Sequence, residues 1–250
     1  MQMNPKKLAG KIALVTGSSR GIGRAMVERL SQDGAAVVVN YVNCSEKAQE
    51  VAAAVKAGGG TAVALEADVS KLEDIQRLFD RTVEHFGRLD ILVNNAGIRI
   101  TKNVAEIGEE EFDRLFAINV KGTFFSCQLA ARRLSDGGRI INVSSAVTKM
   151  MLPGYSIYAA SKAAVDQITR TLSKELGGRD ITVNAVCPGP VDTALLREGK
   201  TKEQIQQMAQ MAALGRIGRV EDIADVVAFL AGDDARWITG QTIHVNGGYV

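Results

Sequence analysis

Short apolar runs rich in valine and isoleucine alternate along the chain with longer segments in which apolar residues recur every three or four positions. The short runs indicate strands that are buried on both faces, and the longer segments indicate amphipathic helices. This alternation is typical of a parallel sheet whose strands are connected by crossover helices. The expected strands are 12–15, 36–39, 61–66, 91–94, 139–143, 182–186 and 242–245. The expected helices are 22–32, 46–56, 72–86, 110–134, 156–176 and 220–230.

No linker or charge block divides the 250 residues. The pattern therefore predicts one α/β domain, residues 1–250, with a doubly wound, seven-stranded parallel sheet and helices on both faces. Ser70 followed by Glu73 predicts a capping box, and Gly34 and Gly87 predict left-handed helix ends. From about 190 to 218 the alternation lapses. This partly helical insertion is expected to cover a substrate, because it follows the carboxyl end of a strand.

The composition excludes several classes of function. Lysines and arginines number 30 against 28 acids, so no basic surface is expected for a nucleic acid or an anionic membrane. The first ten residues lack the apolar core of a signal peptide, and no later apolar run reaches the ~18 residues of a membrane span. Cys44, Cys127 and Cys187 have no paired spacing, which argues against disulfides and a metal site. We expect a cytoplasmic protein whose partners are small molecules and copies of itself.

A glycine-rich segment, T-G-S-S-R-G-I-G, follows the first expected strand and places Gly17, Gly21 and Gly23 at the start of a helix. Glycines permit a tight turn and let backbone amides approach a pyrophosphate, whose charge is favoured at a helix N-terminus. Because this loop lies between a buried strand and an amphipathic helix, it predicts a dinucleotide site in a Rossmann-type fold.

The end of the second strand bears on the choice of cofactor. A carboxylate that accepts from the ribose 2′-hydroxyl is usual there for NAD, but this strand ends in Asn40 and Tyr41. Arg20 in the glycine loop and Ser45 after the strand are candidates to bind a 2′-phosphate. The sequence thus predicts NADP(H) as the preferred cofactor and NAD(H) as the alternative. The competing interpretation makes Arg20 a solvated charge and Ser45 a helix cap.

Tyr158 and Lys162 lie four residues apart in Y-A-A-S-K, and Ser145 stands thirteen residues before the tyrosine. In a helix, residues four apart share a face, so the ammonium is expected beside the phenol. A nearby cation lowers the pKa of a phenol, which predicts a tyrosine that exchanges a proton with an alcohol or ketone near neutral pH.

These motifs together resemble the short-chain dehydrogenase/reductase family over essentially the full length. The matching features are the glycine loop, the N-N-A-G of residues 94–97, Asn119, the serine, tyrosine and lysine, and P-G-P-V-D-T at 188–193. The resemblance implies a catalytic tetrad of Asn119, Ser145, Tyr158 and Lys162. It also implies a cofactor site, which together with the residues argued above comprises Gly17, Ser19, Arg20, Gly21, Ile22, Gly23, Asn40, Tyr41, Ser45, Asp68, Val69, Asn95, Ala96, Gly97, Tyr158, Lys162, Pro188, Gly189, Val191 and Thr193.

The resemblance also gives each group a role. The tyrosine acts as acid or base, the serine binds the substrate oxygen, the lysine holds the nicotinamide ribose, and Asn119 orders a water of a proton relay. Ser144 is an alternative to Ser145, because neighbouring strand residues face opposite sides and only one can point into the site. The thirteen-residue interval to Tyr158 favours Ser145. His85 and His244 lack a serine or cysteine in a nucleophile elbow, which argues against an acyl-transfer triad.

Soft apolar residues near the expected mouth favour a hydrophobic carbonyl or alcohol substrate, although they could instead pack in the core or at a subunit interface. These residues are Val147, Met150, Met151, Leu152, Tyr155, Leu195, Leu196, Met208 and Met211.

Three functions remain open. A general NADPH-linked carbonyl reductase is the main expectation. A 3-oxoacyl-carrier-protein reductase is the alternative, with Arg132, Arg133 and Lys174 as cations that would meet an acidic carrier, although Asp136 departs from that pattern. A non-catalytic dinucleotide sensor is a third candidate, which the complete tetrad disfavours. The resemblance further implies a homotetramer with residues 237–250 at an interface.

Overall fold

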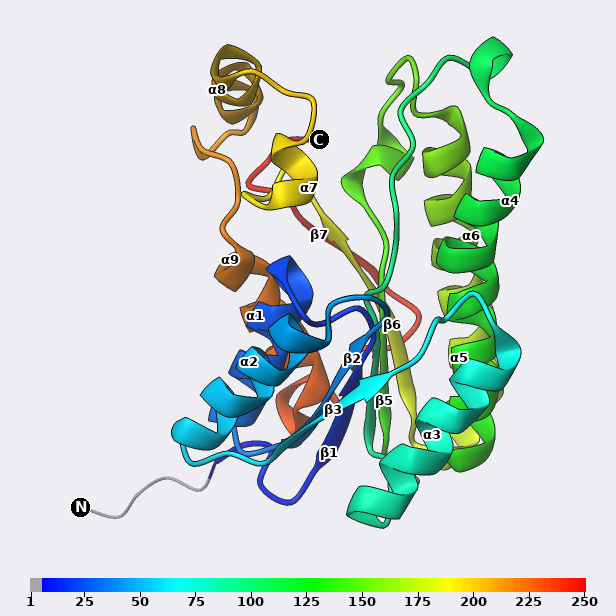
Figure 1. Cartoon of the computed structure of the whole chain (residues 1–250), viewed down its shortest axis with the longest axis vertical. Coiled ribbons are helices and arrows are strands. Elements are labelled where there is room, and N and C mark those ends of the chain that lie inside the picture. The colour runs from blue at the N-terminus through cyan, green and yellow to red at the C-terminus, as the bar shows by residue number, and fades with distance from the viewer. Residues whose placement is uncertain (1–5) are drawn as a thin grey trace.

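The computed structural model describes residues 6–250 and contains the seven predicted strands. Residues 1–5 lie outside the described residues. They belong to the first ten residues, for which the sequence predicts no signal peptide. The strands are β1 (Ile12–Val15), β2 (Ala36–Tyr41), β3 (Ala62–Glu66), β4 (Ile91–Asn94), β5 (Arg139–Val143), β6 (Thr182–Pro188) and β7 (Thr242–Val245). All pair in parallel in the order β3-β2-β1-β4-β5-β6-β7 (Figure 1). The order reverses between β1 and β4, and ligands of such sheets bind in the crevice at this point.

Helices cover both faces of the sheet, as the sequence predicts (Figure 1). One face carries α1 (Gly21–Gln32), α2 (Ser45–Ala57) and α9 (Val220–Ala231), and the other carries α3 (Leu72–Phe86), α4 (Glu109–Phe116), α5 (Thr123–Arg133) and α6 (Ser156–Leu176). Alternate strand residues supply the two cores, because successive side chains point to opposite faces. Val15 and Val39 pack with the first group of helices, whereas Leu14 and Val38 pack with the second.

The predicted helix 110–134 is a single helical run with an interruption. A π-helical segment, η2 (Ala117–Gly122), separates α4 from α5. At Gly122 an added Cβ would lie 2.8 Å from the carbonyl oxygen of Val69, so the segment packs on the neighbouring backbone. Short 3₁₀ helices are η1 (Val104–Glu106), η3 (Ala146–Lys149), η4 (Gly177–Arg179) and η5 (Asp233–Ala235).

The start of α3 differs from the prediction. Its N-cap residue is Lys71, and the Ser70 hydroxyl donates to the Asp68 carboxylate at 2.7 Å instead of accepting from the helix. The Asp74 carboxylate accepts from the backbone N–H of Asp68 at 2.9 Å. The predicted capping box is therefore wrong, because these groups fix the preceding loop. Gly87 ends α3 with φ 81° and confirms the predicted left-handed position.

The insertion after β6 contains α7 (Ala194–Arg197) and α8 (Lys202–Met211). Figure 1 shows both helices beyond the carboxyl ends of the strands, near the C-terminus. Backbone hydrogen bonds from Ala213 to Gly248 and from Leu214 to Gly247 tie the end of the insertion to the C-terminal segment. In the described part of the chain, no helix is long and apolar enough to cross a bilayer.

Candidate cofactor and substrate site

The glycine loop between β1 and α1 packs closely on its neighbours at Gly17 and Gly23, where no side chain would fit. A Cβ on Gly17 would lie 2.9 Å from the Cα of Ala96, and one on Gly23 would lie 2.7 Å from the carbonyl oxygen of Gly17. The Asn95 amide donates to the carbonyls of Thr16 at 2.9 Å and Gly17 at 3.0 Å. The turn after β4 thus holds the loop in place. The backbone amides at the end of the loop form the N-terminus of α1, and a helix N-terminus favours a phosphate group.

Asn40 lies beneath this loop and not on the cavity wall. Its side chain is buried, accepts from the backbone N–H of Gly17 at 3.0 Å and donates to the carbonyls of Leu65 at 3.3 Å and Ala67 at 3.0 Å. Because its side-chain polar atoms bind backbone, Asn40 is placed to support the loop, and its predicted contact with the cofactor stays a prediction. Ser45 is exposed at the first residue of α2 and also lies off the wall.

One cavity of about 1520 Å³ joins the glycine loop to the tyrosine helix α6. Its wall includes every residue predicted to contact the cofactor except Asn40 and Ser45. Those residues are Gly17, Ser19, Arg20, Gly21, Ile22, Gly23, Tyr41, Asp68, Val69, Asn95, Ala96, Gly97, Tyr158, Lys162, Pro188, Gly189, Val191 and Thr193. The volume of the cavity and the glycine loop at its wall fit a dinucleotide.

Tyr158 and Lys162 share one face of α6, as the four-residue spacing predicts. The Lys162 Nζ lies 5.9 Å from the centroid of the Tyr158 ring and donates to the carbonyl of Val143 at 2.8 Å. Burial raises the pKa of Tyr158 and the nearby Ser145 hydroxyl opposes this rise; the same hydroxyl accepts from the backbone N–H of Val147 at 3.3 Å. Ser144 instead donates to the carbonyl of Lys162 at 3.2 Å. Of the two serines, Ser145 is the one beside the phenol.

The protonation states differ from the sequence-based expectation that Lys162 makes Tyr158 acidic. Burial raises the pKa of Tyr158 and outweighs the opposing effects of the Ser145 hydroxyl and the Arg99 charge. Burial also lowers the pKa of Lys162 to about 8, against the effects of Cys187 and Asp166. Because burial raises the pKa of the Cys187 thiol to about 12, the thiol is neutral where Lys162 titrates. Asp166 therefore supplies the negative charge that favours the ammonium.

Asn119 lies in η2 behind the cavity wall and is fully buried. Its amide accepts from the backbone N–H of Ile98 at 2.9 Å and donates to the Ile98 carbonyl at 2.9 Å and to Ser161 Oγ at 3.1 Å. It joins the loop after β4 to α6, one residue before Lys162. π-Helical segments of this kind often occur at functional sites.

Two further buried amides and a hydroxyl fix α6 on the sheet. Asn94 on β4 donates to Asn142 on β5 at 2.9 Å, and Asn142 donates to Thr169 on α6 at 2.9 Å. We call these three residues the amide chain. Polar groups are rarely buried without partners, and each here has one. Asn142 was not predicted, although a polar residue inside the apolar run 139–143 is a usable signal.

Apolar side chains line the cavity beyond Tyr158. They include Val147, Met150, Leu152, Tyr155, Leu195, Leu196 and Met208, all predicted from the sequence. Met151 is fully exposed, and Met211 lies off this wall, with its sulfur 3.7 Å from the hydroxyl of Tyr249.

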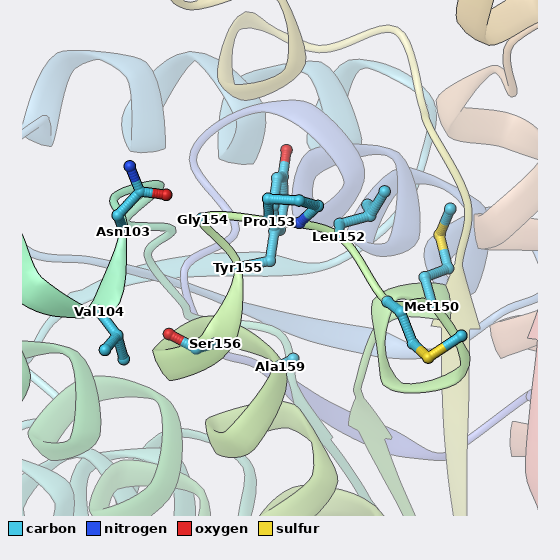
Figure 2. Close-up of a pocket in the computed structure, with 10 residues that line it drawn as sticks. Asn103, Val104, Met150, Leu152, Pro153, Gly154, Tyr155, Ser156 and Ala159 are labelled. Carbon is cyan, nitrogen blue, oxygen red and sulfur yellow. The ribbon is translucent and has the colours of Figure 1, made fainter.

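Figure 2 shows a smaller pocket of about 400 Å³ between Asn103–Val104 and the loop from Met150 to Tyr155. The two cavities share Met150, Leu152 and Tyr155.

Several residues of the wall were not predicted. Asn43 follows β2, Arg99 follows the N-N-A-G turn, and Tyr249 comes from the C-terminal segment. Only tertiary structure brings Tyr249 to the site, because it lies far from the other residues in the sequence. Among residues 6–250, no three histidine, cysteine or acidic side chains gather so as to hold a metal ion.

The chain is similar to known proteins over nearly its full length. A profile of the family described as Enoyl-(Acyl carrier protein) reductase matches residues 17–250. The hydroxynaphthalene reductase-like protein Arp2 of Metarhizium brunneum is 42% identical over 259 residues, which cover 98% of this chain and 97% of that protein. A short-chain dehydrogenase/reductase from Serratia marcescens has a TM-score of 0.94 at 43% identity, covering 97% of this chain and 99% of the other.

The chain is a short-chain dehydrogenase/reductase. The family resemblance expected from the sequence is confirmed, and so is the Rossmann-type fold with one seven-stranded parallel sheet. As a short-chain dehydrogenase/reductase, the protein is an oxidoreductase. Among its structural relatives, the angucycline C-6 ketoreductase LanV has bound NADP; it has a TM-score of 0.93 at 42% identity and covers 100% of this chain and 99% of that one.

Proposed function

We propose that this short-chain dehydrogenase/reductase reduces a ketone to a secondary alcohol with NADPH, and that Tyr158 donates the proton. The observation that carries the proposal is one cavity in which the glycine loop lies at one end and Tyr158, Ser145 and Lys162 lie at the other. When bound, NADPH supplies the hydride. The rest of the chemistry falls to the side chains of the wall.

The raised pKa of Tyr158 suits the reducing direction. A phenol with a raised pKa is protonated at neutral pH, and the oxygen of a ketone becomes a much stronger base than a phenolate as the alcohol forms. Ser145 and Tyr158 both present hydroxyl donors to that oxygen, where negative charge develops. Lys162 stays charged below a pH of about 8 and favours the phenolate that proton transfer leaves behind.

The test is the consumption of NADPH with a panel of ketones, quinones, sugars and acyl thioesters. Tyr158→Phe is expected to lower kcat by roughly 10²- to 10⁴-fold, the usual contribution of a general acid, while NADPH binding is kept. Ser145→Ala is expected to lose more activity than Ser144→Ala, because only Ser145 is beside the phenol. Turnover by Tyr158→Phe at the wild-type rate would rule out the proton-donor role.

A preference for NADPH over NADH is part of the proposal. Arg20 is exposed on the wall at the glycine loop, and residues 41–44 of the same wall contain no acid that would repel a 2′-phosphate. Arg20→Ala is expected to weaken NADPH binding by roughly 10- to 100-fold, the worth of a charge-assisted hydrogen bond, and to leave NADH binding nearly unchanged. An equal loss of affinity for NADPH and NADH would show that Arg20 does not bind the 2′-phosphate.

A 3-oxoacyl-carrier-protein reductase is the second candidate, because the matching profile is described by an acyl-carrier substrate. Arg133, one of the cations predicted to meet a carrier, pairs with Asp80, while Arg132 on the same helix is exposed. Pairing removes part of the positive surface that an acidic carrier would need. Turnover of an acyl-carrier thioester far above that of free ketones would make this the main function.

We also propose a homotetramer in the cytoplasm. Trp237 is 97% exposed, and Phe229, Phe124 and Val250 are also exposed apolar residues of the surface. Large apolar side chains that are exposed on several surfaces are expected in a subunit that meets more than one copy of itself. Light scattering of the purified protein distinguishes a tetramer from a monomer.

A further inference from the structure

Arg99 is a cation of the cavity wall with apolar residues beside it. It is half-buried, and its neighbours on that wall include Ile98, Ile100 and Leu195. The backbone just before it is rigid, because the Asn119 amide forms hydrogen bonds with both the N–H and the carbonyl of Ile98. A guanidinium placed from such a fixed point has a defined reach into the cavity.

The bonding capacity of this guanidinium is largely unused. One Nη donates to the carbonyl of Leu195 in α7 at 2.8 Å, and within residues 6–250 no carboxylate pairs with Arg99. Glu111 on the same wall is occupied, since it accepts from Lys102 at 2.5 Å. A guanidinium carries five N–H donors in a fork that matches the two oxygens of a carboxylate. A charge that is partly desolvated and lacks a partner costs free energy, which an anionic ligand would recover.

Arg99 shares its cavity with the reacting groups Tyr158 and Ser145. In keeping with this placement, the charge of Arg99 opposes the rise in the pKa of Tyr158 that burial causes. Tyr158, Ser145 and Arg99 line the same cavity, so a substrate whose carbonyl meets the two hydroxyls can also reach the guanidinium. Unlike Arg20, which lies at the glycine loop, Arg99 is in the part of the cavity that the apolar substrate wall forms.

We propose that Arg99 is a specificity-determining residue that binds an anionic oxygen of the substrate, so that the preferred substrates are ketones carrying a carboxylate or an ionised phenol on an apolar skeleton. This inference rests on the proposed ketone reduction. It predicts that charge on the substrate, at a distance from the carbonyl, raises kcat/KM, and that Arg99 alone among the arginines is responsible.

The experiment compares para-acetylbenzoate with its neutral methyl ester, and para-hydroxyacetophenone with its neutral methyl ether, each pair at a single pH at which its acidic member is ionised, so that the state of Lys162 is the same for both members. The wild type is expected to favour the anion by roughly 10- to 100-fold in kcat/KM, the worth of a charge-assisted hydrogen bond. Arg99→Leu is expected to abolish this ratio, and Arg99→Lys, which keeps the charge, is expected to keep part of it. A preference for either anion supports the proposal, and the two ketones tell carboxylate from phenolate.

Arg81→Leu is the matched control, because Arg81 is exposed on α3 and off the cavity wall. It should keep the wild-type ratio. Equal losses for charged and neutral ketones in Arg99→Leu would overturn the proposal and make Arg99 only a tie to α7. A wild type that favours the ester would overturn it as well. If the wild type reduced neither the charged nor the neutral ketone, the proposed ketone reduction itself would be refuted. That outcome differs from those that overturn only the role of Arg99.

Discussion

Replacement of Asn40 by aspartate tests whether this residue supports the glycine loop or selects the cofactor. The change swaps the amide NH₂ for an oxygen of nearly the same size. In the wild type that NH₂ donates to the carbonyls of Leu65 at 3.3 Å and Ala67 at 3.0 Å. The new carboxylate would place an acceptor against two acceptors in a site that is 1% exposed.

The size of the effect follows from these contacts. A buried carbonyl that loses its donor costs about 1–3 kcal/mol. Burial beside acceptors is expected to raise the pKa of the new carboxylate by roughly 3 units above about 3.9, its value in the unfolded chain. Because the folded-state pKa is raised, the penalty is absent below about pH 4 and grows as pH rises to the raised pKa. The variant should lose about 2–3 kcal/mol more at about pH 8 than at about pH 5.

The assay is urea unfolding of wild type and Asn40→Asp at both pH values and equal protein concentration. Asn43→Asp is the control, because Asn43 is exposed on the cavity wall next to β2. It should cost less than about 0.5 kcal/mol and reduce the preference for NADPH. If Asn40→Asp kept wild-type stability at both pH values and turned the enzyme toward NADH, the supporting role of Asn40 would be refuted.

Two further predictions concern the loop and the ionisable groups. Gly17 (φ 60°) and Gly10 (φ 76°) are both left-handed, so the backbone strain alone should make alanine cost about 1–2 kcal/mol at either position. Only Gly17→Ala meets a neighbour, the Cα of Ala96 at 2.9 Å, so only it should weaken NADPH binding by roughly tenfold or more, as fluorescence titration would show. Equal binding by both variants would contradict the close approach. Asp166→Asn removes the negative charge that favours the Lys162 ammonium, so the alkaline limit of kcat/KM should move to lower pH from about 8. An unmoved limit would show that the ionisation of Lys162 does not set it.

Periodicity predicted the fold well because the strands are buried on both faces and the helices on one. The predicted bounds of β1, β4, β5, β7, α3 and α6 match the structure. The predicted bounds of α1, α2 and α9 differ by one residue at one or both ends, whereas the predicted helix 110–134 contains a π segment, which a pattern of apolar residues does not reveal. The capping box at Ser70 fitted its motif, but a competing acceptor, Asp68, took the hydroxyl. Local motifs do not show which of several nearby partners a side chain meets.

The candidate site was predictable where its chemistry follows from short spacings. Tyr158 and Lys162 share a helix face, and the glycine loop adjoins a strand, so both could be read from the sequence. Asn40 could not, because the direction of a side chain at a strand end depends on the loops beneath it. The pKa of Tyr158 also escaped prediction, since burial, which depends on the whole fold, outweighs its charged neighbours.

The amide chain of Asn94, Asn142 and Thr169 has a consequence for protein engineering. Hydrogen bonds are directional, so sliding α6 along the sheet by even one residue, about 1.5 Å of helix rise, would break the bond at Thr169. These polar contacts thus fix the position of Tyr158 along the sheet. Substitutions that exchange one apolar side chain for another leave them intact. Libraries aimed at new substrates are best confined to residues 147–155 and 190–218, where the wall can be reshaped without disturbing that alignment.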